Sequence, residues 1–151
     1  MKLRVAWIAP KSRSKEPAYD ALTREYIARI AKYQSIEAAD LSSETALLKL
    51  RERSSGRTSP VFVLLDSRGK QMSSEELAAY IESQQSADVQ QLLFAIGPAD
   101  GFSEQARTRA SRLLSLGKMT LPHELARVVL LEQIYRAFTI LRKHPYHCAH
   151  E

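Results

Sequence analysis

The chain has 151 residues and a formal net charge of +5 at pH 7. This length predicts one domain, residues 1–151, which can bury a core without disulfides or a structural metal. The single cysteine, Cys148, excludes an internal disulfide, and no run approaches the roughly 20 apolar residues of a membrane-spanning helix. We therefore expect a cytoplasmic protein with no membrane segment.

Basic residues form four groups beside predicted loops. A solvated surface accounts for any one group, but four of them in a short chain with a pI near 9.5 favour an RNA partner. The groups are Lys11, Arg13 and Lys15; Arg51, Arg53 and Arg57; Arg107, Arg109, Arg112 and Lys118; and Arg142, Lys143, His144, His147 and His150.

The first part of the chain alternates β-rich and helical patterns. A short β-rich run over 5–9 is closed by Pro10, and apolar residues recur at helical spacing over 17–33. A weaker strand is predicted over 36–41. Ser43 follows it and can cap a second helix, whose apolar face holds three leucines.

The middle of the chain holds two continuous apolar runs, over 61–65 and 92–96, which are typical of strands buried on both faces. Residues 66–69, Asp-Ser-Arg-Gly, predict the end of the first run. Between the runs, Ser73 and Glu76 form the Ser-x-x-Glu capping box that opens a third helix.

The last third predicts a fourth helix capped by Ser103, a short strand over 113–116, and a long helix from Pro122 or His123 to Arg142. Strands that alternate with helices predict an α/β fold, with a mainly parallel sheet flanked by helices on both sides.

Three strand ends are candidate ligand positions, because ligands on parallel sheets bind beyond the carboxyl ends of strands. They are Leu65-Asp66, Gly97-Pro98 and Leu116-Gly117. The loops 97–101 and 117–122 offer backbone N–H and C=O groups to a ligand, although for each segment alone a simple turn or connecting loop is the favoured explanation. Neither matches a dinucleotide fingerprint or a phosphate-binding loop, and no His, Cys, Asp or Glu spacing predicts a metal site.

The final helix is apolar most of the way round, so it must bury more than one face. One face can meet the sheet and another a second copy of the chain, which predicts a homodimer; the alternative is an internal helix of a monomer. Glu132 and Arg136, four residues apart, either pair across one turn or leave Arg136 to hold a phosphate or a carbonyl oxygen.

Three segments carry a resemblance to a known family: 118–123 (Lys-Met-Thr-Leu-Pro-His), 127–138, and 145–147 (Pro-Tyr-His), with support from 61–69. The chain resembles the RlmH (YbeA-type) methyltransferases of the SPOUT class. These methylate N3 of a pseudouridine in 23S ribosomal RNA with S-adenosylmethionine. The resemblance implies a C-terminal trefoil knot and a homodimer whose partner chain completes each site. It also implies cofactor contacts at Leu65, Gly97, Leu116, Gly117, Lys118, Met119, Thr120 and Leu121.

One position departs from the family pattern. Relatives usually have Ile-Gly-Gly at the first loop, whereas Pro98 stands here in place of the second glycine. Proline has no N–H and a fixed φ, so any donor at that position is lost. A contact through the carbonyl group of Gly97 would survive.

The resemblance implies in-line attack of N3 on the methyl group, with no covalent enzyme intermediate. Arg136 is the candidate for stabilising the resulting anion or gripping a phosphate. His147 or Tyr146, helped by His144, is the candidate for accepting the N3 proton or steering the base.

Two other functions stay open. The first alternative is a SPOUT methyltransferase that acts on transfer RNA or on another ribosomal position. The second is a non-enzymatic RNA-binding or ribosome-assembly protein, an alternative that the substitution at Pro98 keeps open. A small domain without an added RNA-binding module favours the assembled ribosome over free RNA as substrate.

Overall fold

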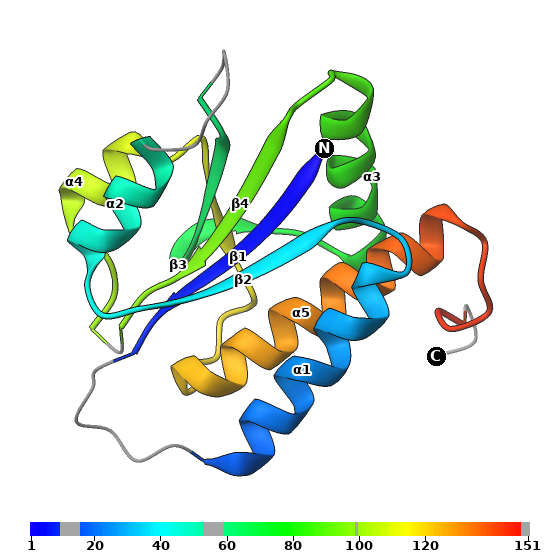
Figure 1. Ribbon diagram of the computed structural model, residues 1–151, viewed down its shortest axis with the longest axis horizontal. Coiled ribbons are helices and arrows are strands. Elements are labelled where there is room, and N and C mark those ends of the chain that lie inside the picture. The colour runs from blue at the N-terminus through cyan, green and yellow to red at the C-terminus, as the bar shows by residue number, and fades with distance from the viewer. Residues whose placement is uncertain (10–15, 53–58, 99, 149–151) are drawn as a thin grey trace.

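The computed structural model describes residues 1–9, 16–52, 59–98 and 100–148. Within them, a sheet of five strands lies between two layers of helices (Figure 1). The strands are β1 (Lys2–Ile8), β2 (Ile36–Leu41), β3 (Val61–Gln71), β4 (Gln91–Ile96) and β5 (Arg112–Ser115). The helices are α1 (Pro17–Ala31), α2 (Glu44–Glu52), α3 (Ser74–Ser86), α4 (Glu104–Arg109) and α5 (His123–Leu141).

The sheet has the order β2-β1-β4-β3-β5, and each strand is parallel to its neighbours. Helices α1, α3 and α5 cover one face, and α2 and α4 cover the other (Figure 1). Successive residues of a strand point to opposite faces. Val5 and Phe94 therefore join the core under α5, whereas Ala6 and Ala95 join the core under α2 and α4. The predicted parallel α/β fold is confirmed.

The elements follow the predicted order, and the predicted caps are present. The hydroxyl group of Ser73 accepts the backbone N–H of Glu76 at 3.0 Å, and the Glu76 carboxylate accepts the backbone N–H of Ser73 at 3.1 Å. At α2 and α4 the cap is one-sided: the hydroxyl groups of Ser43 and Ser103 accept the backbone N–H groups of Ala46 and Ala106. These bonds satisfy backbone donors that the first turn of a helix leaves unpaired.

The predicted end of the third strand at residues 66–69 is wrong. Strand β3 continues to Gln71, and Leu65 and Lys70 both pair with Leu114 of β5. Residues 66–69 therefore bulge from the ladder and do not end it. Polar residues and a glycine serve a bulge as well as a turn, so local sequence does not separate the two.

Helix α5 packs on the sheet with α1 along one side and α3 along the other (Figure 1). These neighbours account for its wide apolar surface, so that surface alone does not require a second copy of the chain. The homodimer and the trefoil knot stay predictions. Among the described residues, none of the helices has the length and hydropathy needed to cross a bilayer. The buried residues of α5 are His123, Arg127, Val128, Leu130, Leu131, Ile134, Tyr135, Ala137, Phe138 and Thr139.

Gly69 gives a test of the bulge, because a Cβ atom at this position would lie 2.5 Å from the carbonyl carbon of Leu113 in β5. The Gly69→Ala substitution should lower the free energy of unfolding by about 1–3 kcal/mol, since backbone cannot rotate away from the added methyl group. Urea unfolding measures this change. Lys70→Ala, exposed and next in the strand, should shift it by less than about 0.5 kcal/mol. Equal stability of the two variants would mean that β3 does not approach β5 this closely.

Candidate functional site

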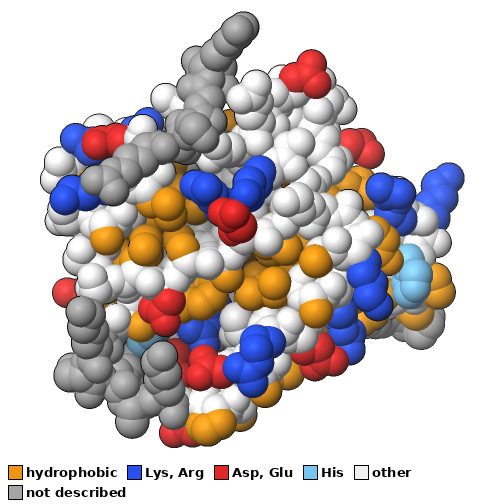
Figure 2. All heavy atoms as spheres, viewed as in Figure 1, with side chains coloured by type: hydrophobic (Ala, Val, Ile, Leu, Met, Phe, Trp, Pro, Cys, Tyr) orange, Lys and Arg blue, Asp and Glu red, His pale blue; other side chains and the backbone are white. Residues whose placement is uncertain are grey.

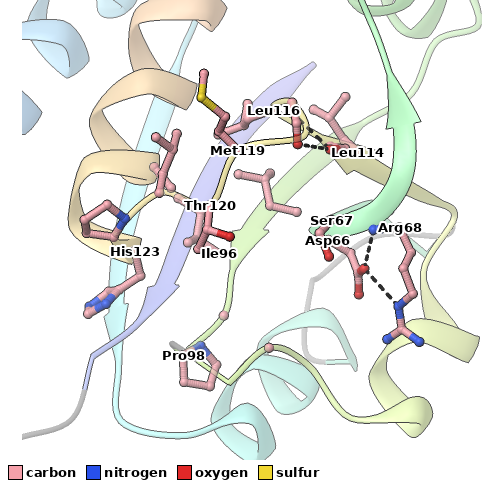
Figure 3. Close-up of a pocket in the computed structure, with 18 of the residues that line it drawn as sticks. Asp66, Ser67, Arg68, Ile96, Pro98, Leu114, Leu116, Met119, Thr120 and His123 are labelled. Carbon is pink, nitrogen blue, oxygen red and sulfur yellow. Dashed lines mark hydrogen bonds and ion pairs between the residues drawn. The ribbon is translucent and has the colours of Figure 1, made fainter.

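A cavity of about 700 Å³ opens where β3 bulges and where β4 and β5 end (Figure 3). The three positions that were expected to converge do so here, although the one in β3 is a bulge and not a strand end. The first residue of α5, His123, completes one wall. A volume of this size is typical of small-molecule sites in proteins. All the residues at which the resemblance implies a cofactor line the cavity: Leu65, Gly97, Leu116, Gly117, Lys118, Met119, Thr120 and Leu121.

The loop after β5 keeps its backbone open toward the cavity. The hydroxyl group of Ser115 accepts the N–H of Gly117 at 3.2 Å and donates to its carbonyl group at 3.0 Å, which fixes the start of the loop. Gly117 has φ +144°, an angle that favours glycine, and no atom lies within 4 Å of the position of a Cβ. Two residues on, Met119 is 86% exposed, an unusual state for a large apolar side chain.

The turn after β4 does not need an N–H group at Pro98. The carbonyl group of Pro98 accepts the N–H of Gly101 at 2.9 Å, and Gly101 has φ +85°. Gly97 is buried, and a Cβ there would lie 3.0 Å from the ring of Phe102. A side chain at 97 would therefore require the Phe102 ring to shift, and proline at 98 is compatible with the turn.

One wall of the cavity is charged. The Asp66 side chain is only 7% exposed; one carboxylate oxygen accepts the backbone N–H of Arg68 at 2.8 Å, and the other lies 3.8 Å from Arg107. Arg68, Arg107 and Lys118 line the cavity together with Asp66 and Asp100, so the lining carries charges of both signs, and Asp66 pairs with both arginines. Sequence reasoning identified Leu65-Asp66 as a strand end and candidate ligand position, but not the contacts of Asp66 with Arg68 and Arg107. In the described part of the chain, no group of three or more His, Cys, Asp and Glu side chains could hold a metal ion.

The predicted catalytic residues Arg136, Tyr146 and His147 lie together. With Glu132 and Glu75 they make up what is called here the tail cluster. One Arg136 nitrogen lies 3.0 Å from Nδ1 of His147, and the guanidinium carbon lies 4.9 Å from the centroid of the Tyr146 ring. The Glu132 carboxylate accepts Nε–H of Arg136 at 2.9 Å and the Tyr146 hydroxyl at 3.2 Å. Glu132 and Arg136 thus pair across one turn, and the pair holds the tail.

His147 is bonded at both ring nitrogens, because its Nε2 lies 2.8 Å from the Glu75 carboxylate. Arginine has donors only, so Nδ1 must accept from Arg136 and the ring proton must lie on Nε2. The lone pair of Nδ1 is therefore occupied in this arrangement. This favours the steering role of His147 over proton acceptance. His144 is exposed, and its Nδ1 accepts the backbone N–H of Tyr146 at 3.1 Å.

Burial raises the pKa of the Tyr146 hydroxyl far above its usual range, and a hydrogen bond with Tyr26 and the charge of Glu132 raise it further. Loss of the proton would place two negative charges side by side in a partly buried setting. Tyr146 therefore remains a hydrogen-bond donor at neutral pH and is unsuited to act as a base.

The cavity and the tail cluster lie at opposite ends of α5. His123 lines the cavity, and Arg136 follows it by 13 residues, roughly 20 Å along the helix. No described residue of the tail cluster lines the cavity. The structure therefore brings the predicted cofactor residues together and the predicted catalytic residues together, but does not join the two sets within one chain.

Comparisons with known proteins identify the family of the chain. The family described as "Predicted SPOUT methyltransferase" matches residues 1–147. Ribosomal RNA large subunit methyltransferase H of Koribacter versatilis (strain Ellin345) is 55% identical over 150 residues, which cover 99% of this chain and 100% of that protein. The chain belongs to this family of SPOUT methyltransferases.

Two further relatives agree with this SPOUT assignment. The protein of the same name from Geobacter sulfurreducens (strain ATCC 51573 / DSM 12127 / PCA) is 41% identical over 155 residues, which cover 97% of this chain and 99% of that one. The structure of a probable methylase family protein from Haemophilus influenzae Rd KW20 has a TM-score of 0.59 at 10% identity, and covers 96% of this chain and 70% of that chain. The second similarity supports the SPOUT fold alone.

The raised pKa of Tyr146 predicts a pH effect. Tyrosinate absorbance should rise by the same amount between about pH 9 and about pH 11 in the folded wild type and in Tyr146→Phe, because Tyr146 does not ionise there. In denaturant the variant should lose about one-sixth of the rise, since the chain has 6 tyrosines. The neutral hydroxyl stabilises the fold below its unfolded-state pKa, and this contribution is lost as pH rises through the higher folded-state pKa. A smaller rise in the folded variant would show that Tyr146 titrates normally.

Proposed function

We propose that this chain transfers the methyl group of S-adenosylmethionine to N3 of a pseudouridine in 23S ribosomal RNA on the assembled ribosome, and hence acts in the cytoplasm. The observation that carries the proposal is the cavity at the strand ends, which is lined by every residue at which the resemblance implies a cofactor contact. Relatives 55% and 41% identical over nearly the whole chain are named ribosomal RNA large subunit methyltransferases, which supports the substrate class.

The lining of the cavity fits this cofactor. Backbone groups of residues 116–121 can hydrogen-bond an adenine edge, and the open space at Gly117 leaves room for close approach. Leu65 and Gly97 supply the remaining contacts from neighbouring strands. When bound, S-adenosylmethionine supplies an electrophilic methyl group on a positively charged sulfur.

Attack by N3 requires loss of its proton. Neither Tyr146, which is held as a donor, nor His147, whose lone pair faces Arg136, accepts that proton in this arrangement. We propose that the tail cluster favours binding of the base after its N3 proton has passed to solvent water, with the positive charge of Arg136 stabilising the anion. Glu132 and Tyr146 fix the guanidinium plane, and His147 steers the base.

We also propose a homodimer in which the cavity of one protomer meets the tail cluster of its partner. Two observations support it. The two sets of site residues lie roughly 20 Å apart along α5 in one chain, too far for direct transfer. At the cavity, the 86% exposed Met119 offers an apolar contact that its own chain does not cover.

Charge supports an RNA substrate. Lys, Arg and His side chains gather on the side of the molecule where the chain ends, beside the tail cluster (Figure 2). Arg142, Lys143 and His144 are all exposed there and can contact phosphates. The non-enzymatic alternative gains no support from Pro98, because the turn at this loop closes through its carbonyl group alone.

The distance between cavity and tail cluster predicts separable effects on catalysis and binding. Arg136→Ala should lower kcat for methyl transfer to ribosomes by about 100-fold, since it removes charge stabilisation in the transition state. The Kd for S-adenosylmethionine, measured by calorimetry, should change by less than about twofold, because Arg136 lies outside the cavity lining. Gly117→Val should weaken cofactor binding at least about tenfold, because it strains the cavity loop. An equal loss of cofactor affinity in Arg136→Ala would rule out this division.

A composite site predicts complementation between these two variants. In an equimolar mixture after subunit exchange, half of the dimers are heterodimers, and each has one cavity and one tail cluster intact. If the site forms across the interface, such a mixture should recover about a quarter of wild-type activity. If cavity and tail of one chain act together, no activity should return. Mixing each variant with itself is the control.

A further inference from the structure

The resemblance implies no role for Glu75, yet within the tail cluster it contacts His147 directly. It lies in the first turn of α3, and its Oε1 is 2.8 Å from Nε2 of His147, 72 residues away in the sequence. This contact joins the C-terminal tail to α3, which precedes α5 in the sequence by more than 30 residues. A carboxylate at this position can accept a hydrogen bond from the Nε2–H group of His147.

We propose that Glu75 is a positioning residue for the methyl transfer of the proposed function. By accepting the Nε2–H of His147, it holds the tautomer whose Nδ1 faces Arg136, and through that ring it fixes the guanidinium group. The opposite tautomer would turn an N–H toward a cation that has no acceptor, and the contact with Arg136 would break.

The first turn of α3 braces the other side of Arg136 as well. The hydroxyl group of Ser74 donates to the side-chain carbonyl of Gln133 at 2.6 Å, and the Gln133 amide donates to Glu132 at 2.9 Å. Glu132 in turn holds Arg136. Adjacent residues of α3 thus reach the guanidinium from both directions. The closed circuit of hydrogen bonds is Ser74–Gln133–Glu132–Arg136–His147–Glu75, with Ser74 and Glu75 joined by the chain.

Glu75 acts on geometry more than on stability. Its side chain is 63% exposed, and exposed ion pairs contribute little to folding. The hydrogen bond from His147 holds the pKa of Glu75 below its usual range, so the carboxylate is the acceptor form at neutral pH. Substitution of Glu75 should therefore leave the fold intact while loosening the arrangement of Arg136.

Three variants test the proposal with ribosomes as substrate. Glu75→Ala should lower kcat by about tenfold and leave Tm and the Kd for S-adenosylmethionine unchanged. Glu75→Gln should stay within about twofold of wild type, because its amide oxygen accepts the same proton. Glu82→Ala, an exposed glutamate on the same helix, should match wild type. An unchanged kcat in Glu75→Ala, or an equal loss in Glu75→Gln, would overturn the positioning role.

Nitrogen NMR of the His147 ring gives a readout that does not depend on activity. In the wild type at neutral pH, the ring should carry its proton on Nε2 alone, and in Glu75→Ala the two tautomers should mix. A wild-type ring protonated at Nδ1 overturns the proposal whatever the activity. An Nε2–H ring in a wild-type protein that does not methylate ribosomes overturns the proposed function instead.

Discussion

The burial of α5 on the sheet, between α1 and α3, is the interaction on which the positions of both the cavity and the tail cluster depend. Leu130, Leu131 and Ile134 in its middle are fully buried against the sheet and leave the helix no freedom to slide. Its first residue therefore stays at the cavity, and its last turns stay beside α3. A rigid helix of this kind sets the spacing between the cavity loop and the tail cluster, which do not meet within one chain.

The segment from β3 to α3 contributes residues to both the cavity and the tail cluster. Its bulge brings Asp66 and Arg68 to the wall of the cavity, and a few residues later Ser74 and Glu75 reach the tail cluster. The bulge needs Gly69, because the backbone of β5 passes where any side chain would begin. A single close approach of two strands therefore positions one end of the cavity and the helix that braces the tail.

The charged groups of the tail cluster are held in fixed hydrogen bonds, which favours orientation of a substrate over proton transfer. Arg136 faces Glu132 on one side and His147 on the other, and the neutral Tyr146 hydroxyl donates to the Glu132 carboxylate. Such a cluster is suited to orienting a substrate and stabilising a negative charge. The same preorganisation explains how a tail of a few residues can carry a fixed arrangement without a regular element of its own.

The sequence by itself determined the elements and the edge of the sheet at which the cavity forms. Apolar runs such as 92–96 and the capping box at Ser73 depend on residues a few positions apart, so local interactions specify them. Parallel strands place their carboxyl ends at one edge, so the convergence of Gly97 and Gly117 followed from the order of elements. The sequence pattern also identified the Glu132–Arg136 pair, which one helical turn brings together.

Only the tertiary structure decided the bulge of β3, the contact of Glu75 with His147 and the separation of cavity from tail cluster. Asp-Ser-Arg-Gly suits a turn as well as a bulge, and the choice depends on β5, more than 40 residues further along the chain. Glu75 carries no local signal of its partner, because 72 residues separate it from His147. Such contacts form only where packing brings distant segments together, and no pattern of neighbouring residues encodes that packing.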